Sequence, residues 1–178
     1  MMKSVDDILF EICLMVIPAA AVFFVSFTLI KRFLENEAKR RTVEMRMNNQ
    51  QLTTPIRLQA YERIVLFLER ISPNSLVMRV HMNGMSAHLL HTELLKSIRT
   101  EFDHNLSQQI YLSASAWEMV KTAKDETTKL VNIAASKVKP DATGMELSQM
   151  IIQISGKLNK LPTQVAVDVI KKEINQLF

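Results

Sequence analysis

The chain has 178 residues, with 22 Lys and Arg against 18 Asp and Glu, and a formal net charge of +4. Its single cysteine excludes a disulfide-stapled fold, and three glycines leave few positions for the tight turns of β-hairpins. Aromatic residues are few, and neither zinc-finger spacing nor a base-stacking platform is present, so no nucleic-acid partner is expected. These properties predict an all-α fold.

An uncharged run of 19 residues, 12–30, lies close to the N-terminus. As a helix it would be about 28 Å long, close to the hydrocarbon thickness of a bilayer. The alternative is a cleaved signal peptide, which needs a positive start and a shorter apolar stretch. Here Asp6, Asp7 and Glu11 precede the run, and a basic cluster ends it. We therefore expect a retained single-pass transmembrane helix.

The orientation of this helix is predicted from the charges at its two ends. Lys3 is the one basic side chain before the run, whereas five basic residues follow it closely. The positive-inside rule then places the C-terminal part in the cytoplasm. Each basic residue near anionic headgroups contributes about 1 kcal/mol of attraction. We expect five residues to lie at the membrane surface: Lys31, Arg32, Lys39, Arg40 and Arg41. Cys13, inside the run, agrees with a reducing compartment.

Residues 31–52 are polar and contain no helix breaker before Thr53. Pairs such as Glu37 and Arg41, four residues apart in the favourable order, predict a helical stalk. Its apolar positions keep no heptad, so the period does not support a coiled-coil dimer. Thr53, Thr54 and Pro55 have the pattern of a cap and a first-turn proline, which predicts that a new helix starts here.

The predicted organisation has four parts, and it leaves one domain of ordinary size after the stalk. These parts are a short tail (1–11), a transmembrane helix (12–30), a juxtamembrane basic stalk (31–52) and a cytoplasmic multi-helix domain (53–178).

The first helix of that domain, over residues 55–71, has a broad apolar side. Leu66 falls in the middle of the opposite, polar arc. Two interpretations stay open: Leu66 packs under another part of the chain, or it is an exposed contact for a partner. The residues on the apolar side are Ala60, Tyr61, Ile64, Val65, Leu68 and Ile71.

Apolar spacing of three or four predicts further helices along the rest of the domain. Ser86 and Ser113 are expected to cap two of them. The predicted helices cover residues 86–104, 113–138, 143–158 and 162–178. Residues 72–75 predict a turn, and 76–84 and 106–112 are ambiguous between helical and extended structure.

Two clusters of side chains are candidate sites of chemistry. His81, Met82, Met85, His88 and His91 are crowded in a way that suggests a soft metal. However, the position of His91 in an apolar helix stripe favours a packed, hydrogen-bonded ring, and no carboxylate lies between the last two histidines as in a zinc-protease motif.

The second cluster, Glu101, Asp103 and His104, fits an acid/base site or the polar end of a helix, and we favour the helix end. No phosphate-binding loop, nucleophile elbow or CxxC motif occurs. We therefore expect no enzyme activity, no cofactor, no metal and no small-molecule substrate.

Two blocks, TTPIRLQAYERIVLFLERISP (53–73) and EFDHNLSQQIYLS (101–113), carry a resemblance when they are taken with the anchor and the basic stalk. Together they resemble an uncharacterised bacteroidete family of small, single-span membrane proteins. The resemblance implies the bacterial inner membrane as location. It implies no activity and no site residues.

The expected function is that of a membrane-anchored interaction or scaffold protein, whose helical domain docks a protein partner, or a second copy, at the cytoplasmic membrane surface. One alternative is a stator-like accessory subunit resembling the b subunit of rotary ATPases, against which the prolines at 55, 73, 140 and 162 argue. Another is a metal-dependent hydrolase that uses His88 and His91.

Overall fold

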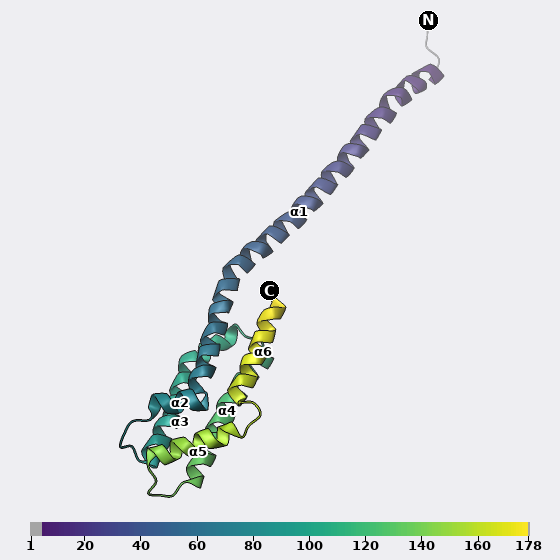
Figure 1. Cartoon of the computed structure of the whole chain (residues 1–178). Helices are drawn as coiled ribbons and strands as arrows, with labels where there is room; N and C mark the ends of the chain where they lie inside the picture. The colour runs from purple at the N-terminus through teal and green to yellow at the C-terminus, as the bar shows by residue number, and fades with distance from the viewer. Residues whose placement is uncertain (1–4, 178) are drawn as a thin grey trace. The chain divides into compact units, whose positions relative to one another are not determined.

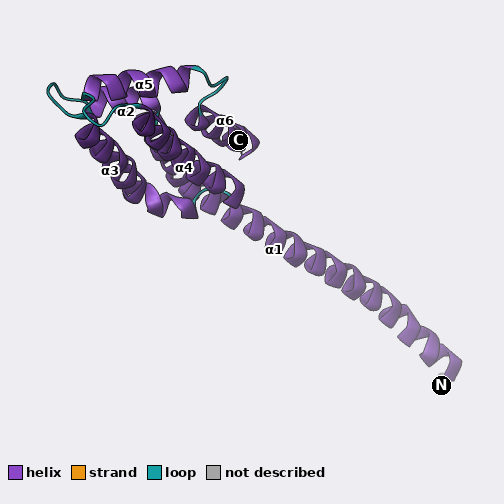
Figure 2. Ribbon diagram, turned by 90° about the horizontal axis from the view of Figure 1, so that it is seen from below, coloured by secondary structure: helices purple, strands orange, loops and turns teal. Residues whose placement is uncertain are grey.

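The computed structural model describes the backbone of residues 5–177 and the side chains from Leu14 onward, except at positions 42, 46, 48–50 and 177. The side chains of Cys13 and Leu177 and part of the predicted tail 1–11 therefore lie outside the described residues. The expected all-helical fold is confirmed for the described part of the chain (Figures 1 and 2). Its elements are α1 (Val5–Ile71), α2 (Pro73–Val80), α3 (Ala87–Asn105), the 3-10 helix η1 (Leu106–Ile110), α4 (Ala114–Lys137), α5 (Gly144–Gly156) and α6 (Pro162–Leu177).

The internal contacts divide the chain into two units, Met1–Thr53 and Thr54–Phe178, and α1 contributes to both. In the first unit, the stretch Leu14–Met45 is long and apolar enough to cross a membrane. None of its most apolar window is buried within the protein, and Phe23, for example, is 73% exposed. By length and composition, this stretch is a candidate membrane span.

The predicted helix start at Thr53–Pro55 is wrong, because α1 continues through Pro55. A proline inside a helix removes one N–H donor, here the donor to the carbonyl of Gln51. Both Pro55 and Gln51 are exposed, so water can satisfy that carbonyl. The flanking helix-forming sequence outweighs the local cost of the proline.

The second unit is built around the face of α1 that the sequence predicted to be apolar. Ala60, Tyr61, Ile64, Leu68 and Ile71 are all buried there. This face belongs to one continuous hydrophobic core that also includes residues of α2 to α6. The predicted amphipathic pattern is therefore confirmed.

Aromatic contacts join α1, α3 and α4 inside this core. The Phe67 ring centroid lies 5.9 Å from that of Phe102, which in turn stacks on Trp117 at 5.6 Å. The Lys124 ammonium lies 4.7 Å from the centroid of the Phe102 ring, within the range of a cation–π interaction. Phe102 of α3 thus contacts three side chains, one from α1 and two from α4.

Helix α4 contacts α3, α5 and α6, and its contacts with α6 are the most extensive between any two of these helices. α5 lies crosswise at the end of the bundle where α3 begins (Figures 1 and 2). The residues of α4 that the sequence predicted to face the core are buried or, for Val138, half-buried just after the helix ends. They are Trp117, Val120, Ala123, Thr127, Leu130, Val131, Ala134 and Val138.

Two helix caps were predicted correctly, because Ser86 and Ser113 accept hydrogen bonds from the amides of Leu89 and Ala116, each at 3.2 Å. The predicted turn at 72–75 is wrong. Pro73 instead starts α2, where its missing N–H costs no helix bond.

The ambiguity at 76–84 is resolved as helix up to Val80, followed by a turn at Gly84 with a positive φ of 86°. Of the ambiguous segment 106–112, residues Leu106–Ile110 form a 3-10 helix. An isolated short strand has no neighbour to pair with, which explains why strand propensity does not prevail here.

The loops before α3 and α5 pair with each other, a feature that the sequence did not predict. Ser86 and Thr143 form an antiparallel bridge. The Ala87 amide donates to the Ala142 carbonyl at 2.9 Å, and the Gly144 amide donates to the Met85 carbonyl at 2.7 Å. These bonds hold the N-termini of two helices side by side.

Substituting Gly144 tests this bridge. An added Cβ would lie 3.0 Å from the Met85 carbonyl oxygen and 3.2 Å from the His81 ring. Gly144→Ala is expected to lower the free energy of unfolding by about 1 to 2 kcal/mol through overpacking. Urea unfolding of the full chain in detergent micelles, followed by the fluorescence of Trp117, measures this change.

Gly156→Ala is the matched control, because no atom lies within 4 Å of its added Cβ apart from its chain neighbours and the adjacent backbone of its own helix. Its free energy of unfolding should stay the same or rise slightly. Equal stability of the two variants would contradict the tight contact at Gly144.

Candidate functional site

An apolar groove lies among α4, α5 and α6, with a volume of about 380 Å³. One wall is a row of side chains on α4, spaced three to seven residues apart, so that they share one face of the helix. The other wall comes from the end of α5, the turn that follows it and the start of α6. The apolar lining residues are Met119, Ala123, Leu130, Ile133, Ile154, Leu158, Pro162 and Val165.

Several groove side chains remain exposed although they are apolar. Ile133 is 48% exposed and Leu158 is 44% exposed. The sequence placed Leu158 on the same side of its helix as the buried Leu147 and Ile151, but α5 ends at Gly156, so Leu158 leaves that register. A single exposed apolar residue is ordinary, whereas a group of them around one hollow marks a surface that can bind.

Charged groups flank the groove. Lys129 on α4 pairs with Glu126 at 2.6 Å, and Lys160 in the turn before α6 pairs with Asp168. The hydrogen bond with Glu126 raises the pKa of Lys129, and the bond from Lys160 lowers the pKa of Asp168. Both shifts favour the charged forms of Lys129 and Asp168. The groove thus has an apolar floor and an ammonium group on each wall.

A polar cluster around Glu173 joins three segments at another place on the second unit. The Tyr61 hydroxyl of α1 donates to Glu173 Oε1 at 2.6 Å, and the Ser113 amide donates to the same oxygen at 3.0 Å. The Ser113 hydroxyl donates to Oε2, and Arg57 donates to the Tyr61 hydroxyl at 3.2 Å. We call these four residues the Glu173 cluster.

The cluster shifts the pKa values of its members. Burial alone would raise the pKa of Glu173, but the hydrogen bonds from Ser113 and Tyr61, together with the charge of Arg57, outweigh burial and lower that pKa. Burial, and then the bond to Glu173, raise the pKa of Tyr61. The carboxylate therefore stays charged and the phenol stays protonated at neutral pH.

Serine, glutamate and tyrosine together could suggest acid/base chemistry. However, both carboxylate oxygens of Glu173 already accept hydrogen bonds from the protein, and the Ser113 hydroxyl also caps α4. These contacts fasten α6 to α1 and to the start of α4. The sequence analysis missed Glu173, although the hydroxyl of the buried Tyr61 signals that a polar partner must lie nearby.

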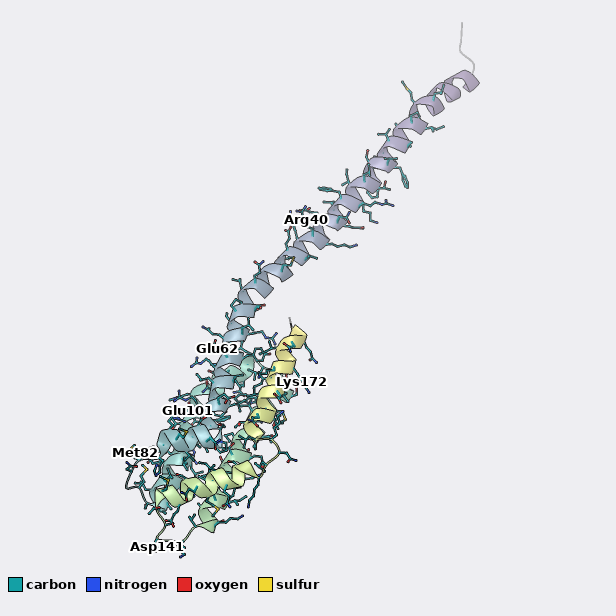
Figure 3. All side chains as sticks on the ribbon, in the orientation of Figure 1. Arg40, Glu62, Met82, Glu101, Asp141 and Lys172 are labelled. Atoms are coloured by element: carbon teal, nitrogen blue, oxygen red, sulfur yellow. The ribbon has the colours of Figure 1, made fainter. Side chains whose placement is uncertain are left out.

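The five basic residues predicted to lie at the membrane surface are all exposed on α1: Lys31, Arg32, Lys39, Arg40 and Arg41. Figure 3 shows Arg40 projecting from this helix. The predicted pair of Glu37 and Arg41 is confirmed at 3.4 Å, and Arg40 also pairs with Glu44 at 3.0 Å. Membrane contact by these residues stays a prediction.

Leu66 is 56% exposed, so the interpretation in which it packs under another part of the chain is wrong. It does not line the apolar groove. Its contact with a partner stays a prediction.

The three histidines between residues 81 and 91 have different surroundings. His91 Nε2 lies 2.8 Å from Asn132 Oδ1 in a hydrogen bond between α3 and α4, which agrees with a packed, hydrogen-bonded ring. The His81 ring lies against Gly144, and His88 is exposed. Among the described residues, no group of three or more His, Cys, Asp or Glu side chains could hold a metal ion.

Glu101 is held by two arginines, which gives it a structural role. Its Oε1 lies 2.8 Å from Arg70 of α1 and 3.2 Å from Arg79 of α2. Asp103 and His104 are exposed near the end of α3. The interpretation of these residues as the polar end of a helix fits this arrangement.

Replacing Glu173 tests the Glu173 cluster through its pH dependence. A carboxylate with a lowered pKa contributes stability that is present above its unfolded pKa, about 4.3, and is lost as the pH falls through the folded value. Glu173→Gln should therefore lower the free energy of unfolding by about 1 to 2 kcal/mol at pH 7, and the difference from wild type should shrink below pH about 4.

Urea titrations of the full chain in micelles between pH 3 and pH 7 measure this difference. Glu62→Gln, at an exposed position of α1, serves as the control and should change little at any pH (Figure 3). A loss for Glu173→Gln that does not vary with pH would refute the ionic role of Glu173.

Comparison with known proteins gives one match. Residues 7–177 match DUF7935, a family of unknown function. No curated protein and no solved structure matches the chain. The resemblance to a family without an assigned function is thereby confirmed, whereas a bacteroidete source and a membrane location of that family stay predictions. Since the match covers nearly all of the sequence, the chain belongs to the family DUF7935.

Proposed function

We propose that this protein is a membrane-anchored interaction protein, in which residues 12–30 stay in the bilayer and the helical second unit docks a protein partner at the cytoplasmic membrane surface. The observation that carries the proposal is the exposure of every described apolar side chain from Leu14 to Ile30. Each Å² of such surface left in water costs about 25 cal/mol, and lipid removes that cost.

The basic residues support the proposed orientation. Lys31 and Arg32 directly follow the apolar run. Lys39, Arg40 and Arg41 lie about 14 to 17 Å beyond Ile30, the last residue of the run, at 1.5 Å per residue. That distance reaches the headgroups and the region of negative potential next to them. A bacterial inner membrane with the second unit in the cytoplasm agrees with this distribution of charge.

The second unit supports docking rather than catalysis. Its apolar groove presents side chains suited to covering another surface, while the Glu173 cluster and the Glu101 ion pairs are occupied in holding helices together. A binding role needs only such a surface on a stable scaffold.

One observation favours a second candidate, a stator-like accessory subunit. α1 continues through Pro55, so this proline does not interrupt the helix as the sequence suggested. The other three prolines still oppose a long rod, because Pro73 and Pro162 start new helices and Pro140 lies between α4 and α5.

Labelling of a single cysteine tests the anchor and its orientation. In a Cys13→Ser background, Met145→Cys places the only thiol at an exposed site on α5. In sealed spheroplasts, a membrane-impermeant maleimide should label it only after permeabilisation. The protein should also stay in the membrane pellet after extraction at alkaline pH.

A charge variant provides the control for the role of the basic residues. Replacing the five membrane-surface residues by Gln should let a fraction of molecules insert with the second unit outside, and that fraction becomes labelled without permeabilisation. Five distant replacements should have no such effect, since basic residues far from the span do not set orientation. Those controls are Lys96, Lys121, Lys157, Lys171 and Lys172. Full labelling of the otherwise unaltered chain before permeabilisation would contradict the proposed orientation.

Isolation from the native membrane tests the docking role directly. The full chain, solubilised in mild detergent, should carry a stoichiometric companion protein that survives washing at moderate salt. A lone monomer in repeated isolations, after crosslinking as well as without it, would contradict the proposed function.

A further inference from the structure

The apolar groove has the length of a helix-binding site. On α4 its wall extends from Met119 to Ile133, with Ala123 and Leu130 between them. These positions span 14 residues, which corresponds to about 21 Å along the helix axis. A guest helix of about four turns covers the same distance.

The opposite wall is also apolar, so the groove can receive a row of apolar side chains from a bound helix. Ile154 and Leu158 contribute from the end of α5 and the turn beyond it, and Pro162 and Val165 contribute from α6. The volume of about 380 Å³ accommodates several apolar side chains. Helices that lie in such grooves insert one apolar stripe, with anchors at spacings of three, four and seven residues.

The lysines on the two walls favour acidic residues beside the apolar stripe of a bound helix. Lys129 and Lys160 contribute an ammonium group on each side, with side chains that are 63% and 50% exposed. Lys129 pairs with Glu126, which also lines the groove, and Lys160 pairs with Asp168. An ammonium group has three donors, so each pair leaves donors that a guest can use. A guest with acidic residues on both sides of its apolar stripe can use the remaining donors.

We propose that the apolar groove binds an amphipathic α-helix of a partner protein, with an acidic residue on each flank facing Lys129 and Lys160. The inference rests on the proposed docking function and assigns it a site and a class of partner.

Two other occupants fit less well. A fatty acyl chain carries charge at one end only, and so leaves an ammonium group on one wall without a counterpart. In a second copy of this chain, the stalk 31–52 has six basic and three acidic residues, which would bring like charges close to Lys129 and Lys160.

Photo-crosslinking in the native membrane tests the assignment. The full chain carries p-benzoylphenylalanine in place of Ile133, on the groove wall, or in place of Ile152, an exposed isoleucine of α5 outside the groove. Ile133 should crosslink to another protein, and mass spectrometry should locate the bond in a segment with an apolar helical stripe and acidic flanks. Ile152 should give no such product.

A peptide that covers the crosslinked segment then tests the charges. Its affinity for the detergent-solubilised full chain should fall at least about tenfold when Lys129 and Lys160 are both replaced by Glu. Lys171→Glu, at an exposed position of α6, should leave the affinity unchanged.

Each other outcome overturns the assignment. A crosslink from Ile133 to lipid or to a second copy identifies a different occupant, and the absence of any crosslink means that the groove is not a docking site. A partner that crosslinks only from Ile152 would refute the groove and keep the proposed function. A chain without any companion would refute both.

Discussion

The rest of the structure depends on one constraint, which is that the apolar side chains at the start of α1 have no protein surface to pack against within the described part of the chain. Leu14 to Ile30 present leucine, valine, isoleucine and phenylalanine side chains to their surroundings, and none of the apolar ones is buried. A soluble protein would cover such a helix with a second layer, because the hydrophobic effect makes exposed apolar surface costly. Lipid is the covering proposed here, and it gives the flanking basic residues a reason for their position.

The second unit shows the opposite pattern, because its helices bury their apolar faces in one hydrophobic core. Two carboxylates also link these helices to one another. Glu173 connects α6 to α1 and to the cap of α4, and Glu101 connects α3 to Arg70 of α1 and Arg79 of α2. Each carboxylate accepts at least two charged or polar donors, so neither is left unpaired. A bundle fastened in this way can present a groove without collapsing into it.

Helical periodicity allowed much of this fold to be predicted, because the apolar residues on the buried faces of α1 and α4 recur at spacings of three and four. Ser86 and Ser113 could be recognised as caps from the hydroxyl that precedes each apolar stripe. The errors at Pro55 and Pro73 arise from the same ambiguity, since proline suits both the first turn of a helix and an exposed interior position whose freed carbonyl meets water.

The candidate site was harder to predict than the faces of the helices. Tyr61 and Glu173 are separated by 112 positions, and no local pattern pairs residues so far apart. The bridge between the loops before α3 and α5 depends on two backbones, which leave little trace in side chains. The groove arises because α5 ends at Gly156, which leaves Leu158 and Ile133 exposed. Such a hollow is a property of how helices end and cross.

The most direct test of the anchor is the depth of a tryptophan in the bilayer. Trp117 is the chain's only tryptophan, so Trp117→Phe combined with Phe23→Trp leaves one fluorophore in the apolar run. In vesicles of lipids brominated along the acyl chain, its fluorescence should be strongly quenched, and Trp117 of the unaltered chain should keep its emission. Equal emission from both positions, or a mature chain that lacks residues 12–30, would contradict a membrane-anchored bundle.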